Sequence, residues 1–146
     1  MSKSNAFENA LQLLVYNNTN IANIGDATGL RGSSAAGSFY ISLYTADPGE
    51  AGDQTTNEAT YTSYARVAVG RNSGALSVTG NGVTNVAAIT FPAATGGSNV
   101  ITHFGIGTAS SGAGFLLHSG TLTPNLSVSN GITPQIPASG MTQTED

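Results

Sequence analysis

The sequence contains neither cysteine nor tryptophan, and each absence excludes a class of site. Without cysteine, the chain has no disulfide, no thiolate metal site and no cysteine nucleophile. Without tryptophan, a sugar-binding platform would lack its usual stacking side chain. Charge is also scarce, because Lys, Arg, Asp and Glu make up 8% of the chain, against about 25% in ordinary soluble domains.

Basic residues are the scarcest, with four Lys and Arg side chains and a formal net charge of -4. Four scattered positive charges cannot form the clustered basic face that nucleic-acid binding requires. No apolar run approaches the roughly 18 residues of a membrane span. The first residues lack the basic stretch and apolar segment of a secretory signal, so we expect synthesis in a cytoplasm.

Ser, Thr, Asn and Gly together make up nearly half of the chain. Such a surface costs less to desolvate than one of Lys and Glu, whose long charged side chains lose more entropy and hydration. The composition therefore favours large, permanent protein interfaces. A length of 146 residues fits one compact unit.

The start of the chain predicts the one helix. Ser4 or Asn5 can cap it, and Asn17-Asn18 ends it. Apolar residues at spacings of three and four form a stripe, which consists of Phe7, Ala10, Leu11 and Leu14. Two interpretations stay open: the helix packs on its own domain, or it is an arm that docks on a neighbouring subunit.

After residue 38 the apolar period changes to two, beginning with a half-buried strand in which Phe39, Ile41 and Leu43 share one face. Turn signals recur about every 8 to 12 residues with no intervening helix. We expect a mainly β fold, an antiparallel β-sandwich or jelly-roll-like barrel with one N-terminal α-helix. Residues 1–38 would form the helix and its connecting arm, and residues 39–146 the β-sandwich domain. The expected strands are 39–44, 64–69, 76–79, 86–91, 100–106, 115–120, 126–128 and 141–144.

Half of the acidic residues lie within twelve positions, and they are Asp47, Glu50, Asp53 and Glu58. Such density could hold calcium, but the spacing does not match an EF-hand loop. A solvated or partner-facing loop is the favoured interpretation, with residues 50–60 exposed. Four tyrosines lie near the same region, at positions 40, 44, 61 and 64. They either pack the sheet face under a loop or anchor a protein interface.

No motif for hydrolysis, phosphoryl transfer or redox chemistry is present. His103 and His118 lie within predicted strands, and neither has a second histidine or a carboxylate at metal-ligand spacing. A turn, not a helix, follows Gly105-Ile106-Gly107, which excludes a dinucleotide loop. We therefore predict a non-enzymatic protein without cofactor, metal or small-molecule substrate.

Several blocks of the sequence resemble small virion proteins of tailed bacteriophages. The blocks are 38–50 (SFYISLYTADPGE), 64–69 (YARVAV), 89–93 (ITFPA), 101–107 (ITHFGIG) and 117–122 (LHSGTL), together with 5–10 and 21–26. Members are often labelled tail-fibre proteins, and small β-sandwich proteins of such phages also serve as capsid decoration or cement proteins. The resemblance implies a structural protein located in the virion.

Two functions follow from this resemblance. The first is a capsid decoration protein that binds the assembled shell in many copies, as a homo-oligomer, and stabilises it by multivalent contact. The alternative is a tail or tail-fibre component with a host-recognition or connector role. The partners would be the major capsid protein or other virion proteins. The expected contact residues are Phe7, Leu11, Leu14, Tyr40, Tyr44, Asp47, Glu50 and Tyr61.

Overall fold

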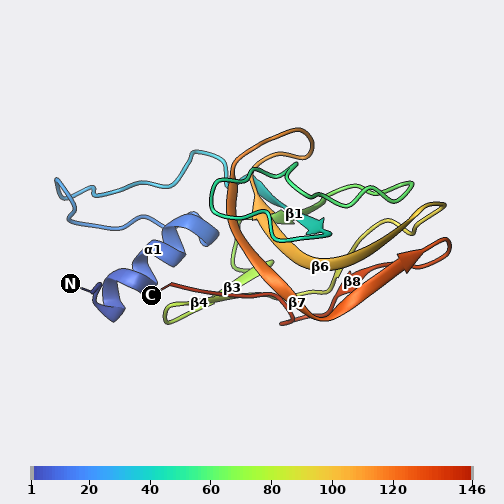
Figure 1. Ribbon diagram of the computed structural model, residues 1–146. Helices are drawn as coiled ribbons and strands as arrows, with labels where there is room; N and C mark the ends of the chain where they lie inside the picture. The colour runs from blue at the N-terminus through green and yellow to red at the C-terminus, as the bar shows by residue number, and fades with distance from the viewer. Residues whose placement is uncertain (1, 146) are drawn as a thin grey trace. The chain divides into compact units, whose positions relative to one another are not determined.

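The computed structural model describes residues 2–145 and contains one helix and nine strands in that range (Figure 1). The chain divides into two compact units, each assembled from separate stretches of sequence. Unit 1 combines the chain up to Ser38 with Gly70–Ala88 and with the chain from Pro137 onward, whereas unit 2 combines Phe39–Val69 with Ile89–Ile136.

Unit 1 contains the helix and a small sheet. Its elements are α1 (Asn5–Asn17), β3 (Leu76–Thr79), β4 (Gly82–Asn85) and β9 (Thr142–Thr144). Unit 2 contains β1 (Ser38–Tyr44), β2 (Val67–Gly70), β5 (Ile89–Thr90), β6 (Ser98–Gly107), β7 (Leu116–Ser129) and β8 (Gln135–Ile136), and one end residue of β1 and of β2 belongs to unit 1.

Helix α1 begins and ends as the sequence predicts. The Ser4 side chain accepts a hydrogen bond from the backbone N–H of Phe7, and Asn18 ends the helix with a left-handed φ of 59°. Arg71 satisfies the free carbonyls of the last turn, because its guanidinium donates to the backbone oxygens of Leu14 and Val15. A cation at this end also interacts favourably with the helix dipole.

The small sheet of unit 1 has the order β3-β4-β9, and both pairs are antiparallel. Helix α1 packs against β3 and β4. Asn85, 1% exposed, ties the C-terminal segment to β4: its side chain donates to the Pro137 carbonyl and accepts from the Met141 N–H, each at 2.8 Å. These bonds satisfy a buried amide that would otherwise be costly to desolvate.

Unit 2 is built on a four-stranded sheet with the order β2-β1-β6-β7, accompanied by the two-stranded pair β5-β8. Strands β1 and β6 are antiparallel, and their register places Ile41 opposite Ile106 and Leu43 opposite Phe104. Ile41, Leu43 and Ile106 are at most 2% exposed and form the centre of the core.

The expectation that β1 is half-buried is wrong, because both of its faces are covered. Ser42 and Tyr44 lie on the face expected to meet solvent, yet both are 0% exposed. The segment after β1 folds back over that face, where the Gln54 side chain donates to Ser42 Oγ at 3.4 Å and the Ala59 N–H donates to the Leu43 carbonyl at 2.8 Å.

Other strand boundaries also differ from expectation. The predicted strand at 86–91 is wrong, since β4 ends at Asn85 and β5 covers only Ile89–Thr90. The two predicted strands at 115–120 and 126–128 form one element, β7, and strands β4 and β8 have no counterpart among the expectations. These boundaries follow the pairing between strands rather than the local periodicity of the side chains.

The expected mainly β fold with antiparallel sheets and one N-terminal helix is confirmed, and the sheets within residues 2–145 do not close into a barrel. Whether residues 39–146 form a domain by themselves stays a prediction. No helix in the described part of the chain is long and apolar enough to cross a membrane.

Candidate interaction surface

Arg66 and Glu58 form a buried ion pair in unit 2. The Arg66 side chain is 2% exposed and that of Glu58 is 17% exposed. Two guanidinium nitrogens contact the two carboxylate oxygens, with Nε–Oε1 at 2.6 Å and Nη2–Oε2 at 2.8 Å. This bidentate geometry is the strongest arrangement available to the pair, and the hydrogen bond to Glu58 raises the pKa of Arg66.

The rest of the guanidinium holds backbone carbonyls from two loops. Arg66 donates to the carbonyls of Ala109 and Gly112, each at 2.8 Å, and to that of Gln54 at 3.1 Å. Loops normally satisfy their backbone groups with water. Here one cation satisfies three carbonyls, so it ties the loop after β1 and the loop after β6 to the same point.

Gln54 makes a second connection between these loops and is 0% exposed. Its Oε1 accepts from the Ala109 N–H at 2.9 Å, and its backbone N–H donates to the Ala113 carbonyl at 2.8 Å. Glycine is required beside it, because a Cβ at Gly107 would lie 2.0 Å from the Gln54 Cδ and one at Gly114 would lie 2.2 Å from its Oε1.

The interpretation of residues 50–60 as a long exposed loop is therefore wrong for much of its length. Gln54 is fully buried, Ala59 is 5% exposed and Glu58 is mostly covered. Its polar composition suggested solvent, but the polar side chains bond inward. The sequence signal that could have indicated this was Arg66 itself, one of only four Lys and Arg residues, eight positions after Glu58.

The four acidic residues of this loop do not gather into a cation site. Glu58 binds Arg66, and the Asp53 carboxylate accepts from the N–H and hydroxyl of Thr55, which lowers the pKa of Asp53. Asp47 and Glu50 line a hollow of about 370 Å³, together with Gly49, Gly52 and Leu116–Ser119. No group of three potential metal ligands occurs within residues 2–145.

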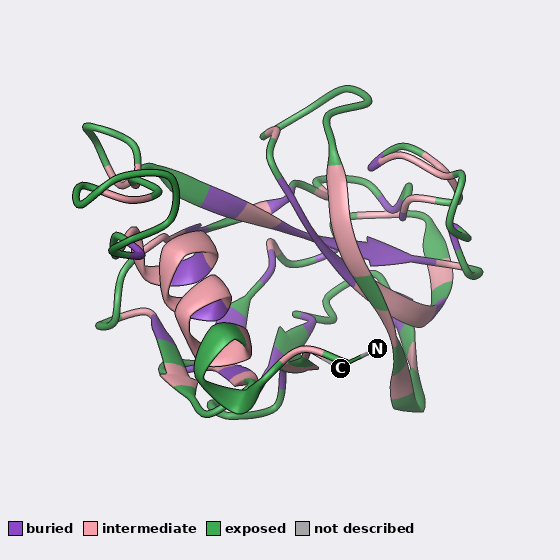
Figure 2. Cartoon of the chain, turned by 90° about the vertical axis from the view of Figure 1, so that its left-hand side faces the viewer, coloured by how far each residue is buried: buried purple, intermediate pink, exposed green. Residues whose placement is uncertain are grey.

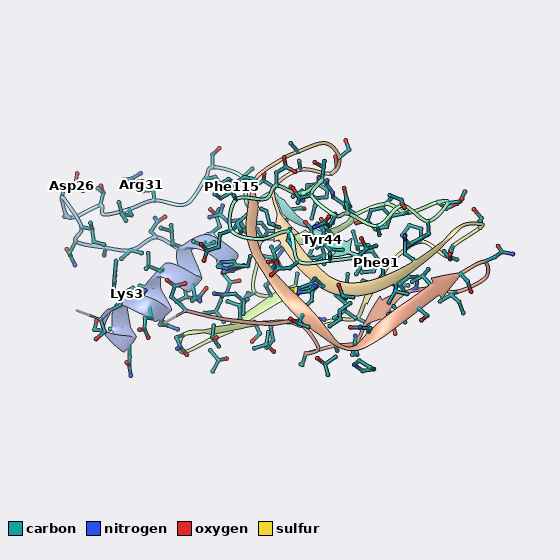
Figure 3. The ribbon with its side chains drawn as sticks, in the orientation of Figure 1. Lys3, Asp26, Arg31, Tyr44, Phe91 and Phe115 are labelled. Carbon is teal, nitrogen blue, oxygen red and sulfur yellow. The ribbon has the colours of Figure 1, made fainter. Side chains whose placement is uncertain are left out.

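The tyrosines divide into buried and partly exposed members. Tyr44 is 0% and Tyr61 2% exposed, so the structure places both expected contact residues in the interior rather than on the surface; Figure 3 labels Tyr44 there. Tyr64 donates to Glu58 Oε1 at 2.9 Å and accepts from the Leu43 N–H, whereas Tyr40 is half-buried.

The two histidines occupy different settings. His103 lies in β6, with its Nδ1 2.8 Å from the hydroxyl of Thr102. His118 lies in β7 and lines the hollow beside Asp47 and Glu50.

Helix α1 is fixed to its sheet by a polar face. Gln12 and Tyr16 are its buried residues. The Gln12 amide donates to the Asn81 carbonyl at 3.0 Å and to Gln143 Oε1 at 2.8 Å, and Asn9 donates to the Gly80 carbonyl at 2.8 Å.

The apolar stripe of α1 points away from this polar face. At about 100° per residue, the direction of the stripe lies roughly 170° from that of Gln12 and Tyr16. Phe7 is 39% exposed, and Leu11 and Leu14 are half-buried. Figure 2 shows the exposed first turn of the helix in green. The stripe is thus available for a contact that the single chain does not make.

Replacing Arg66 should destabilise the protein strongly. In Arg66→Met, the Glu58 carboxylate loses its cation and the carbonyls of Gln54 and Gly112 lose the guanidinium donor. Breaking a buried pair in this way costs about 3–5 kcal/mol. Arg66→Lys should fall between this variant and the wild type, because an ammonium keeps the charge but not the bidentate fork.

The measurement is the free energy of unfolding from urea titration. Arg31→Met is the matched control, because Arg31 is exposed and its loss should change stability by less than about 0.5 kcal/mol. Equal losses for Arg66→Met and Arg31→Met would contradict the role given to the pair.

Tyrosine ionisation should be suppressed in the native state. Burial raises the pKa of Tyr16, Tyr44, Tyr61 and Tyr64. A raised folded pKa contributes stability that is fully present below the unfolded value of about 10 and is lost as the pH rises through the folded value. Near pH 10–11 we expect native protein to show much less tyrosinate absorbance than the same protein in denaturant. Equal absorbance in both states would contradict this prediction.

One family of known proteins matches the chain, and it is described as podophage GP4 fiber I protein gp80. The match covers residues 5–144, from the first residue of α1 to the last residue of β9. No curated protein matches the chain. The family match confirms the resemblance to tailed-phage virion proteins, and it includes segments of both units. The chain belongs to the podophage GP4 fiber I protein family and is a structural protein of the phage virion.

Proposed function

We propose that this protein is a non-enzymatic subunit of a podophage tail fibre that acts as a connector between virion proteins. The observation that carries this proposal is the match to a fibre protein family over residues 5–144. The match supports the tail-fibre alternative better than capsid decoration, because the family description names a fibre.

The polar chemistry of unit 2 supports a structural role. Arg66 and Glu58 are charged groups that lie mostly buried in unit 2. They bind each other, and Arg66 also binds the loop backbone. A catalytic pair would instead need its charged groups turned toward a cavity where a substrate could reach them. The charges of the Arg66–Glu58 pair hold loops against a sheet, which gives the surface a fixed shape for assembly.

The apolar stripe of α1 supports the connector role. Its outward position, with Phe7 39% exposed, suits burial against another protein, since burying apolar side chains stabilises a permanent contact. A host sugar would instead be recognised by polar groups around a stacking ring. We propose that Phe7, Leu11 and Leu14 form the main contact with another virion protein, and that the exposed Asp47 and Glu50 form a second contact. That Tyr40 is a contact residue stays a prediction.

The number of copies of this protein in purified particles tests whether it lies in the tail or on the capsid shell. We expect the chain to fractionate with tails, at a level of tens of copies or fewer in each particle, because fibres are few. The measurement is quantitative mass spectrometry on separated tails and empty shells, with the major capsid protein as the internal standard. Hundreds of copies that fractionate with the shells would contradict the fibre role and support capsid decoration.

Disrupting the stripe should prevent incorporation without unfolding the chain. Phe7→Ser removes an exposed ring, so the free chain should keep its urea midpoint while its amount in assembled particles falls at least tenfold. Ile24→Ser is the matched control, because Ile24 is 38% exposed and lies outside the helix. Both variants would be supplied in trans during infection by a phage that lacks the gene. Normal incorporation of Phe7→Ser would exclude the helix as the contact.

A further inference from the structure

A hollow in unit 2 is lined by two segments that are far apart in the sequence. It has a volume of about 370 Å³, and its lining comes from residues 47–52 and from the start of β7 at Leu116–Ser119. Asp47 and Glu50 are exposed, whereas Leu116 and Leu117 are half-buried. Two carboxylates and two leucines thus share one concave surface, and both segments belong to unit 2.

Both segments are held in place by contacts within unit 2. The Asp47 carboxylate accepts from the Gly49 N–H at 2.9 Å, and the Asn57 side chain donates to the Asp47 carbonyl at 2.9 Å. Strand β7 is held by its antiparallel pairing with β6. A Cβ at Gly105 would lie 2.8 Å from the Leu116 Cδ1, so this leucine packs directly on the sheet. A hollow that is formed in advance reduces the entropy cost of binding.

The exposed charges of unit 2 are negative. Within Phe39–Val69 and Ile89–Ile136 the one Lys or Arg residue is Arg66, and the acidic residues are Asp47, Glu50, Asp53 and Glu58. The Arg66 side chain is 2% exposed and binds Glu58. Because this cation is buried and paired, the hollow presents an anionic surface to a partner. Complementary charge gives protein contacts their specificity, so the hollow is suited to a cation.

The apolar part of the hollow favours an organic cation over a metal ion. Calcium takes about six to eight oxygen ligands, and no group of three potential metal ligands occurs in the part of the chain that the structure describes. Lys and Arg bury their aliphatic stems on apolar surface such as that of Leu116 and Leu117, while the charged group reaches a polar site. Arginine is enriched at protein interfaces and lysine is depleted, and a guanidinium is less strongly hydrated than an ammonium.

An exposed aromatic residue adjoins the hollow in the chain. Phe115 precedes Leu116 and is 69% exposed. Its N–H donates to Thr108 Oγ1 at 3.0 Å, and its carbonyl accepts from the Thr108 N–H at 3.1 Å. Arg66 holds the loop that ends at Phe115. An exposed ring on a fixed backbone is typical of the aromatic anchors of protein interfaces.

We propose that this hollow receives an arginine side chain of another virion protein, which rests on the proposed function and identifies the chemistry of its second contact. The guanidinium binds the carboxylates of Asp47 and Glu50, and the aliphatic stem packs on Leu116 and Leu117. Because the carboxylates lie at the surface, the contact guides the approach of the partner and weakens as salt is added.

The test measures binding of the purified full-length chain to tails and to empty shells, each isolated from a phage that lacks the gene. The double variant Asp47→Asn with Glu50→Gln removes both charges, and the asparagine keeps the acceptor for the Gly49 N–H. It should bind at least tenfold more weakly than the wild type at low salt. At about 1 M salt, where the screening length is about 3 Å, the two proteins should bind similarly.

Two single variants form a matched control, because each removes one negative charge. Asp26 is exposed in unit 1, so Asp26→Asn should bind as the wild type does, whereas Glu50→Gln should weaken binding severalfold. Glu50 is exposed as well, so Glu50→Gln should keep the wild-type urea midpoint. Equal affinities for Asp26→Asn and Glu50→Gln would overturn the inference.

Chemical modification of the binding fraction tests the identity of the cation. Phenylglyoxal, which blocks arginine, should abolish binding of the wild type, whereas acetylation of lysine should leave it unchanged. The reverse result would overturn the assignment to arginine.

The fraction that binds separates this contact from the fibre role. Wild-type binding to shells rather than tails would contradict the fibre role, and its loss in the double variant would still support the hollow as the contact. Wild-type affinity in the double variant, on tails or on shells, would overturn the inference. A wild-type chain that binds neither fraction would overturn it as well.

Discussion

The guanidinium of Arg66 is the point on which the architecture of unit 2 depends. It neutralises Glu58 and satisfies carbonyls from the loops that follow β1 and β6. Burying a cation is costly unless every donor has a partner, and here the partners come from segments that are about 50 residues apart. The interaction is therefore formed only when the sheet, both loops and the pair are all in place, which gives the loops one conformation.

Gln54 and the glycines beside it show the same constraint in steric form. The side chain of Gln54 occupies the space that a Cβ would need at Gly107 and at Gly114. Two of the many glycines thus serve packing rather than flexibility. This arrangement explains how a chain with few charged residues holds long loops in place. A few buried polar groups with all their hydrogen bonds made contribute more to stability than many exposed ion pairs.

The orientation of α1 also depends on hydrogen-bonded polar side chains, and it bears on assembly. Amide hydrogen bonds from Asn9 and Gln12 fix the helix to the turn after β3 and to β9, which leaves the apolar stripe on the opposite side. In an isolated protein such an arrangement leaves apolar surface exposed to water, whereas in a virion a neighbouring protein can bury that surface. The small number of charged residues is consistent with a chain whose surface is completed by other subunits.

The local signals in the sequence were enough for the helix ends, the mainly β fold and several strands, including Leu76–Thr79. They succeed because capping, turn chemistry and side-chain period act over a few residues. The resemblance to tailed-phage virion proteins was also readable, because it rests on short blocks of sequence.

Local signals could not show which surfaces face inward. The stripe of Phe7, Leu11 and Leu14 is the more apolar side of the helix, yet Gln12 and Tyr16 are its buried residues. Gln143, far along the chain, accepts a hydrogen bond from Gln12. Tyr44 is interior because a polar segment folds over the face of β1 that carries it, and Tyr61, 2% exposed, donates to the Pro92 carbonyl. In each case the covered face is decided by segments that are separate in the sequence, and these come together only once the tertiary structure has formed.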